Sequence, residues 1–215
     1  MPLRNRVTPF NDIVAVAARG TLMGNRGCLH DGQGLIRRRV CTTRSWVTCV
    51  LRFKDRRRKL LQPGRYTELF FLDEPTALAA GHRPCGECRR ADYRRFLEAW
   101  RAGNAMPGAP LAEIDRRMHA ERIDRATRRP LRWRAVPATL PDGAMVALEP
   151  GGAIAHLVWG GKLLRWSATG YRPDGAVGGT PMTEVLTPRS TVAALAAGYR
   201  PLPHASVATP GAVAP

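Results

Sequence analysis

The stretch TALAAGHRPCGEC, residues 76–88, predicts a short helix, an abrupt stop and a pair of thiols at the exit. Asp73 or Glu74 can cap the start of this helix, and Gly81 stands where a left-handed residue ends one. Pro84 prevents the helix from resuming. The chain is therefore expected to leave the helix in an extended conformation that leads directly to the two cysteines.

A near copy of this stretch, ALAAGYRP, occurs at residues 194–201. It differs from the first copy by one substitution, Tyr199 in place of His82, and no cysteine follows it. Ser190 or Thr191 can cap its helix. The repeated unit is thus interpreted as a device that ends a helix, and His82 as a packing residue, since a tyrosine fills the same place without any thiols.

The rest of the chain mixes strand and helix patterns, which predicts an α+β fold of short helices around a zinc knuckle and a small antiparallel sheet. Gly160-Gly161 is a good two-residue hairpin turn between two strands of a C-terminal meander. The expected strands cover 39–53, 65–73, 144–149, 153–159 and 162–167, and further helices cover 89–101 and 111–127.

These patterns suggest a division of the chain near residue 130. Residues 1–130 are predicted to form an α+β domain that contains the zinc knuckle. Residues 131–202 are predicted to form a small antiparallel β subdomain with a terminal helix, and residues 203–215 a disordered tail.

Charge is the strongest signal in the composition. The chain has 34 basic and 17 acidic residues, a formal charge of +17, and all but three of the basic residues are arginines. Arginine presents a planar fork that suits phosphate, so nucleic acid is the expected partner. The candidate phosphate contacts are Arg56, Arg57, Arg58, Arg83, Arg89, Arg90, Arg94 and Arg95.

The sequence offers no expected membrane segment. The longest apolar run near the start, IVAVAA from Ile13, is too short to cross a bilayer. Five cysteines at irregular spacing do not resemble a secreted disulfide framework. We therefore expect a cytoplasmic protein without a membrane partner.

Cys85 and Cys88 form a Cys-x-x-Cys pair, whose thiols can both reach one ion from a tight turn. Zinc is the predicted cofactor. A redox-active dithiol and two inert thiols are the alternatives, but the βαβ pattern that normally surrounds a redox pair is absent from the sequence. The pair supplies half of a zinc site.

Several side chains are candidates for the other half. His119 comes first, with Asp115 one helical turn earlier as the partner of its second ring nitrogen. His30 comes next, with Asp31 beside it. Cys49 falls on the apolar face of a predicted strand, which favours an ordinary buried thiol. The other histidines are interpreted as a structural strand residue, His156, and a tail residue, His204.

The segment ALAAGHRPCGECRR resembles the zinc-binding module of the Ada family of DNA alkylation-repair proteins. The resemblance, over residues 76–90, implies that Cys85 and Cys88 are the second ligand pair of such a module and that Arg83 and Arg89 lie near a DNA backbone. In that family the other ligands form a cysteine pair some thirty residues upstream, where this chain has FKDRRRK. The methyl-acceptor chemistry of the family is therefore not carried over.

The leading hypothesis is a zinc-stabilised protein that binds nucleic acid, DNA more than RNA, with a repair or regulatory role. The alternative is a metal-dependent hydrolase or nuclease that uses His30, Asp31, His119 and Glu121. A basic protein-interaction module without catalysis is a third class. The sequence leaves open whether the protein is an enzyme.

Overall fold

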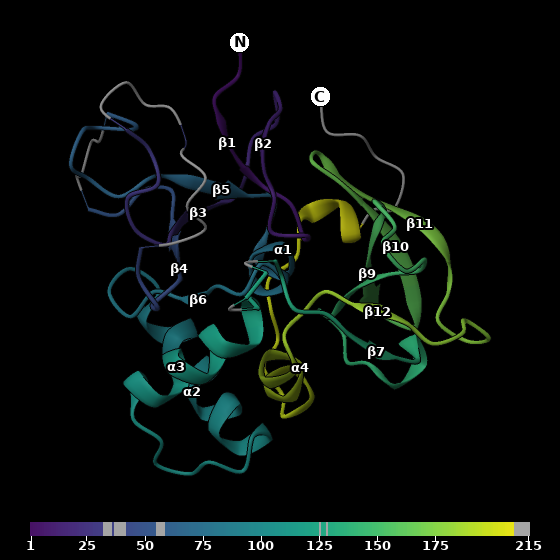
Figure 1. Ribbon diagram of the computed structural model, residues 1–215. Coiled ribbons are helices and arrows are strands. Elements are labelled where there is room, and N and C mark those ends of the chain that lie inside the picture. Colours follow the sequence, from purple (N-terminus) through teal and green to yellow (C-terminus); the bar gives the residue numbers. More distant parts are fainter. Residues whose placement is uncertain (32–35, 37–41, 55–58, 125, 128, 209–215) are drawn as a thin grey trace.

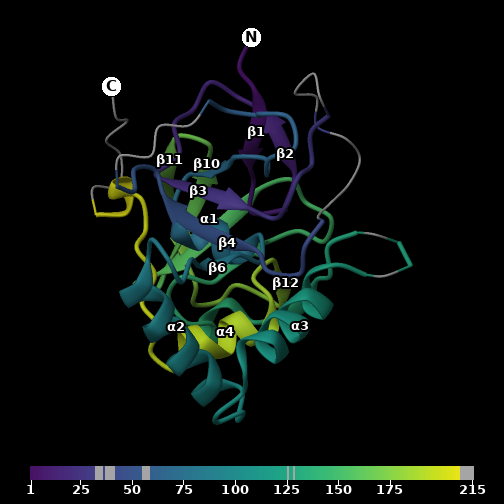
Figure 2. The same ribbon diagram turned by 90° about the vertical axis from the view of Figure 1, so that its left-hand side faces the viewer.

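A computed structural model describes residues 1–31, 36, 42–54, 59–124, 126–127 and 129–208. Within these residues the chain forms two six-stranded sheets and four α-helices, which confirms the predicted α+β class. The two sheets lie on either side of the short helix α1, and α2, α3 and α4 gather at one end of the molecule (Figure 1). Figure 2 shows the same three helices side by side along that end.

The first sheet has the strand order β2-β1-β5-β3-β4-β6. Two of its pairings are parallel, β1 with β5 and β4 with β6, and the others are antiparallel. Its strands are β1 Arg4–Val7, β2 Ile13–Ala15, β3 Leu22–Asn25, β4 Val47–Val50, β5 Leu69–Phe71 and β6 Arg83–Pro84.

The second sheet is antiparallel throughout, in the order β11-β10-β9-β8-β12-β7. The expected meander is present, and Gly160 and Gly161 turn between β9 and β10 with φ of +56° and +72°, values suited to glycine. The strands are β7 Trp133–Ala135, β8 Met145–Ala147, β9 Ala155–Trp159, β10 Lys162–Ser167, β11 Gly170–Ala176 and β12 Thr183–Val185.

The helices follow the sequence patterns closely but not at every end. They are α1 Glu74–Ala79, α2 Arg90–Gly103, α3 Leu111–Arg122 and α4 Arg189–Ala196, with short 3-10 turns η1 Pro137–Thr139 and η2 Ala205–Val207. The α3 helix ends before the predicted residue 127 because Ile123 becomes extended and bridges to Pro130. Pro188, and neither Ser190 nor Thr191, occupies the N-cap of α4.

The helix of the opening stretch, α1, lies where three apolar clusters meet. Leu78 packs among the helices, Ala79 joins the cluster under the second sheet, and Ala77 and Ala80 join the cluster under the first. All six residues of α1 are buried, and Asp73 caps the helix by accepting a hydrogen bond from the Thr76 amide. A six-residue helix can touch every cluster only because small alanine side chains let its neighbours approach closely.

The segment after α4 is ordered further than predicted. The Leu202 amide donates to Glu74 Oε2 and the His204 amide to Asp73 Oδ2, both over 2.9 Å, before the turn η2. The expectation of disorder from residue 203 is therefore wrong for residues 203–208, because these bonds tie them to the start of α1. Residues 209–215 lie outside the described residues. The predicted division into domains at residue 130 stays a prediction.

Candidate metal centre

The pairing of β6 with β4 brings distant cysteines together. In this parallel pair Val47 lies opposite Arg83 and Thr48 opposite Pro84, and the Cys85 amide donates to the Thr48 carbonyl over 2.9 Å. The next residues in register are Cys49 and Cys85. Because registered residues of neighbouring strands point to the same face of a sheet, their thiols project to the same side.

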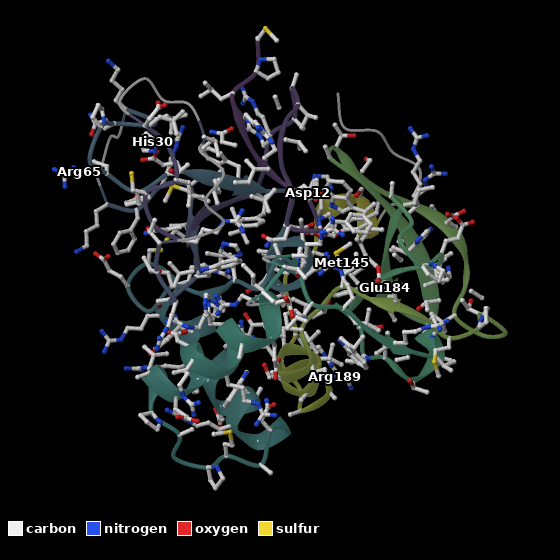
Figure 3. The ribbon with its side chains drawn as sticks, in the orientation of Figure 1. Asp12, His30, Arg65, Met145, Glu184 and Arg189 are labelled. Carbon is white, nitrogen blue, oxygen red and sulfur yellow. The ribbon has the colours of Figure 1, made fainter. Side chains whose placement is uncertain are left out.

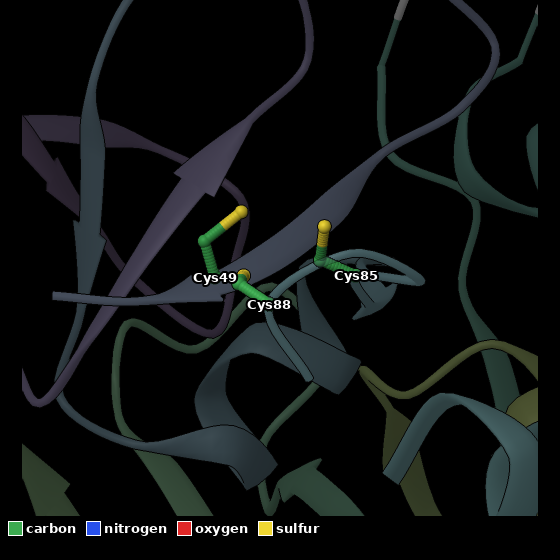
Figure 4. A group of neighbouring side chains, drawn as sticks. All are labelled: Cys49, Cys85 and Cys88. Carbon is green, nitrogen blue, oxygen red and sulfur yellow. The ribbon is translucent and has the colours of Figure 1, made fainter. Parts of the chain in front are cut away.

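Cys88 completes a group of three. The ligand atoms of Cys49, Cys85 and Cys88 all lie within 4.8 Å of one another, close enough to hold a metal ion. Figure 4 shows the three side chains where the turn after β6 passes along β4, with the sulfurs of Cys49 and Cys85 pointing in the same direction. The interpretation of Cys49 as an ordinary buried thiol is corrected: Thr48 of β4 and the preceding Trp46 are fully buried on one face, and Cys49 lies on the half-buried opposite face.

The backbone around the group donates hydrogen bonds to sulfur. The Glu87 amide donates to Cys85 Sγ over 3.4 Å, and the Val50 amide donates to the Cys88 sulfur. A hydrogen bond from Cys49 lowers the pKa of Cys85 to about 5, and the same bond raises the pKa of Cys49. Burial raises the pKa of Cys88. A divalent cation that binds the three sulfurs would displace the protons that they carry.

Arg89, the residue after Cys88, fixes the turn to the rest of the protein. Its guanidinium donates to Thr48 Oγ1 on β4 and to Glu74 Oε1 on α1, each over 2.8 Å, and to Asp92 on α2. One buried side chain thus joins the strand that carries Cys49 to both helices that flank the Cys-x-x-Cys turn. The relative positions of the three thiols follow from this connection.

A cavity of about 250 Å³ lies against the sulfurs. Apolar and aromatic side chains make up much of its lining, together with the three cysteines and the carboxylates Glu68 and Glu87. Glu68 is held in place, because its Oε2 accepts a hydrogen bond from the Leu61 amide. The thiols are therefore reached through a pocket that is mainly apolar.

The structure does not bring either predicted histidine to the thiols. His30 bonds through Nδ1 to Thr67 Oγ1 over 2.7 Å and through Nε2 to the Gln62 carbonyl over 3.0 Å. His30 follows β3 at the outer end of the first sheet (Figure 3). His119 lies on α3 in a basic cleft that Arg44, Arg116 and Arg117 also line. Neither His119 nor His30, the two histidines predicted as metal ligands, belongs to the group of three thiols.

Asp115 also has a different role from the predicted one. Both of its carboxylate oxygens accept hydrogen bonds from Arg83, over 2.7 and 2.8 Å. The pair is buried, so Asp115 orients Arg83 and not the ring of His119.

The residues proposed for hydrolysis do not assemble either. Glu121 Oε2 accepts from the Ser190 amide over 2.8 Å, at the start of α4. Across the described ranges, the three cysteines are the only group of three or more histidine, cysteine and acidic side chains at metal-binding distance. His30, Asp31, His119 and Glu121 therefore do not form a shared metal centre.

The candidate phosphate contacts separate into two sets. Arg83 and Arg89 are buried in ion pairs, with Asp115 and with Glu74 and Asp92, which makes them structural residues in this fold. Arg90, Arg94 and Arg95 are exposed on α2. The remaining three, Arg56, Arg57 and Arg58, lie outside the described residues.

The other histidines have packing or structural roles. His82 is fully buried, with its ring 5.1 Å from that of Trp46 and 4.7 Å from that of Phe71. His156 Nε2 lies 2.7 Å from Asp174 on the second sheet.

Cys49 was not predicted from the sequence as a partner of the Cys-x-x-Cys pair. The signal was present in part, since Pro84 enforces an extended exit that can pair with a strand. The register that selects Cys49 is set by backbone hydrogen bonds between segments far apart in the chain.

No helix in the described part of the chain combines the length and apolar character needed to cross a membrane. In comparisons with known proteins, no family model, no curated protein and no solved structure matches the chain.

Proposed function

We propose that this protein binds one zinc ion through Cys49, Cys85 and Cys88 and binds nucleic acid, DNA in preference to RNA, with the exposed arginines next to that centre. The observation that carries the proposal is the convergence of three thiols from two separate chain segments within 4.8 Å. Cysteines that form no disulfide seldom converge in this way unless they bind a common ligand.

Zinc is supported by the donor set. Thiolate sulfur favours zinc over the hard cations magnesium and calcium, and a Cys-x-x-Cys turn with a third cysteine from a neighbouring strand is typical of zinc sites. The amide N–H groups that point at sulfur stabilise the thiolate form that the metal requires. Bound zinc would cross-link β4 to the turn at residues 85–88.

Nucleic-acid binding is supported by the surface that begins where this turn ends. The first residues of α2 place Arg90 and Arg94 in solvent, and both line a surface groove with Tyr93, Gly86 and Arg83. The charge of Arg83 is neutralised by its ion pair with Asp115. The chain as a whole carries a formal charge of +17. Zinc would hold the turn that orients these arginines toward a phosphate backbone.

The preference for DNA, and a role in repair or regulation, rest on the resemblance of residues 76–90 to the Ada zinc module. The family's upstream ligands are a cysteine pair, whereas this chain contributes one upstream cysteine, Cys49, to the group. The family's methyl transfer is not part of the proposal.

Metal analysis tests the first half of the proposal. Wild-type protein purified without chelator is expected to hold about one zinc per chain, and Cys49→Ala and Cys85→Ala are each expected to lose most of it. Cys28→Ala is the matched control, because Cys28 Sγ instead contacts the His30 carbonyl. A metal-free wild type, or full zinc content in Cys49→Ala, would contradict the assignment.

Salt-dependent DNA binding tests the second half. The affinity for a duplex should fall steeply as salt rises, and the double variant Arg90→Gln/Arg94→Gln should reduce the slope of log K against log salt by about two. Arg165→Gln/Arg172→Gln, on exposed positions of β10 and β11, is the control and should leave the slope nearly unchanged. Equal losses in both double variants would show that binding is not located on α2.

A further inference from the structure

Among the described residues, the three thiols supply three of the four ligands that a zinc ion takes. Zinc in proteins is almost always four-coordinate, and structural sites supply all four ligands from the protein. Among the residues that the structure describes, no fourth histidine, cysteine or acidic side chain joins the group within 4.8 Å. The following inference rests on the proposed zinc centre.

The cavity described above lies directly against this group, since all three cysteines line it. The remaining lining is largely apolar and includes Met23, Phe53, Leu60, Tyr66 and Phe70. An ion held by the thiols would therefore face a cavity whose lining is mostly apolar.

The volume of the cavity limits what can enter. An apolar cavity of about 150 Å³ holds one benzene molecule, so about 250 Å³ has room for a ring with a further substituent. Drug-sized ligands occupy about 300 Å³ or more. The cavity is suited to a small molecule.

Charge limits the donor atom. Three thiolates around a divalent cation leave the centre with a net negative charge, and Glu68 and Glu87 also line the cavity. A neutral fourth ligand adds no further negative charge to these surroundings, whereas an anionic ligand would. Neutral nitrogen is a donor that zinc accepts readily, as it does from histidine.

We propose that the metal centre is open and that this cavity binds a small neutral nitrogen heterocycle, with the ring nitrogen on the metal and the apolar body against the aromatic walls. The metal fixes one end of the ligand and the cavity selects its shape. The protein would then have a small-molecule site in addition to its arginine surface.

Cobalt(II) in place of zinc in the full-length protein gives the test, because its visible absorption reports the ligands of a tetrahedral site. We expect one cobalt per chain and a saturable spectral change on titration with either imidazole or 4-phenylimidazole. The phenyl ring should lower the dissociation constant at least about tenfold, because it removes additional apolar surface from water.

Two variants place the effect in the cavity. Leu60→Trp adds bulk at a partly exposed wall residue, so it should retain cobalt but lose the preference for 4-phenylimidazole. Leu202→Trp, at a more exposed position that does not line the cavity, should behave as the wild type.

The other possible outcomes contradict different parts of the proposal. Absence of bound cobalt would contradict the zinc centre itself. If cobalt binds but its spectrum does not change with either heterocycle, the proposal of an open coordination position is overturned. The proposed zinc centre would still stand. Equal affinity for the two heterocycles, or an unchanged preference in Leu60→Trp, would overturn binding within the cavity.

Discussion

The two copies of the octapeptide, residues 77–84 and 194–201, end their helices with the same backbone geometry. In the first copy the His82 amide donates to the Ala77 carbonyl and the Gly81 amide to the Leu78 carbonyl. In the second copy Tyr199 and Gly198 make the equivalent bonds to Ala194 and Leu195. Both glycines have positive φ, +81° and +102°, as a Schellman motif requires.

The copies differ in what surrounds the same backbone. His82 is enclosed between Trp46 and Phe71, whereas Tyr199 packs edge-on against Phe96 and its hydroxyl donates to Glu74 Oε1 over 2.6 Å. Arg83 is buried with Asp115, while its counterpart Arg200 is exposed.

The exits differ as well. After Pro84 the chain pairs with β4 and reaches the thiols, and after Pro201 it bonds to the start of α1. The segment after the second copy is therefore bonded to the start of α1, the helix that contains the first copy. The octapeptide thus stops a helix in both places. Only the first exit pairs with a strand that carries a cysteine, and this pairing forms the candidate metal centre.

The largest expected difference between the copies concerns their arginines. Arg83→Gln removes the partner of buried Asp115 and should lower the free energy of unfolding by about 3–5 kcal/mol. Arg200→Gln, at the equivalent exposed position, should change it by less than about 0.5 kcal/mol. Denaturant titration of both variants measures the difference, and similar losses would show that the buried pair is not what distinguishes the copies.

A smaller difference is expected at the glycines. Alanine at either position adopts an unfavourable positive φ, which costs about 1–2 kcal/mol. A Cβ at Gly81 would also lie 2.5 Å from Cγ and Cδ of Arg122, whose guanidinium stacks on Trp46, whereas a Cβ at Gly198 meets nothing within 4 Å. Gly81→Ala should therefore lose about 1 kcal/mol more than Gly198→Ala in thermal or chemical unfolding. Equal losses would mean that Arg122 moves aside freely.

The smallest effect depends on pH and on His82. Burial, with the charges of Arg26 and Arg122, lowers the pKa of His82 well below its usual value. Below about pH 6.5 the unfolded chain binds a proton at this residue that the folded chain does not, so stability falls as pH falls toward the folded-state pKa.

The comparison with His82→Phe isolates this contribution, because phenylalanine keeps a ring in the slot and cannot titrate. Between pH 6.5 and 5.5 the wild type should lose up to about 1 kcal/mol more stability than the variant. Unfolding free energies at saturating zinc at each pH measure the difference. Parallel pH profiles would indicate that His82 is protonated in the folded protein.

Local patterns anticipated much of the fold. The cap at Asp73, the stop at Gly81, the turn at Gly160-Gly161 and the long helix α2 were all predicted, because each depends on the conformational preferences of a few adjacent residues. The limits of α3 and the order at residues 203–208 were not, since bonds to distant residues decide both.

The candidate site was anticipated by half. Cys85 and Cys88 belong to one turn, and their spacing was enough to predict that they bind a metal ion. The predicted partners His119 and His30 do not belong to the group of three thiols, because spacing in the chain carries no information about which strand lies beside the turn. Arg83 and Arg89 were likewise predicted to contact phosphates, but in the fold they are buried in ion pairs with Asp115 and Glu74.

The sequence by itself determined two helix stops, a Cys-x-x-Cys turn and a strongly basic chain, because dihedral preference, residue spacing and charge are properties of neighbouring residues. Only the tertiary structure decided that Cys49 stands beside that turn, that an apolar cavity lies against the sulfurs, and that Arg90, Arg94 and Arg95 remain in solvent. The physical reason is that strand register and burial arise from contacts between residues far apart in the chain, where a shift of one residue would turn Cys49 to the opposite face.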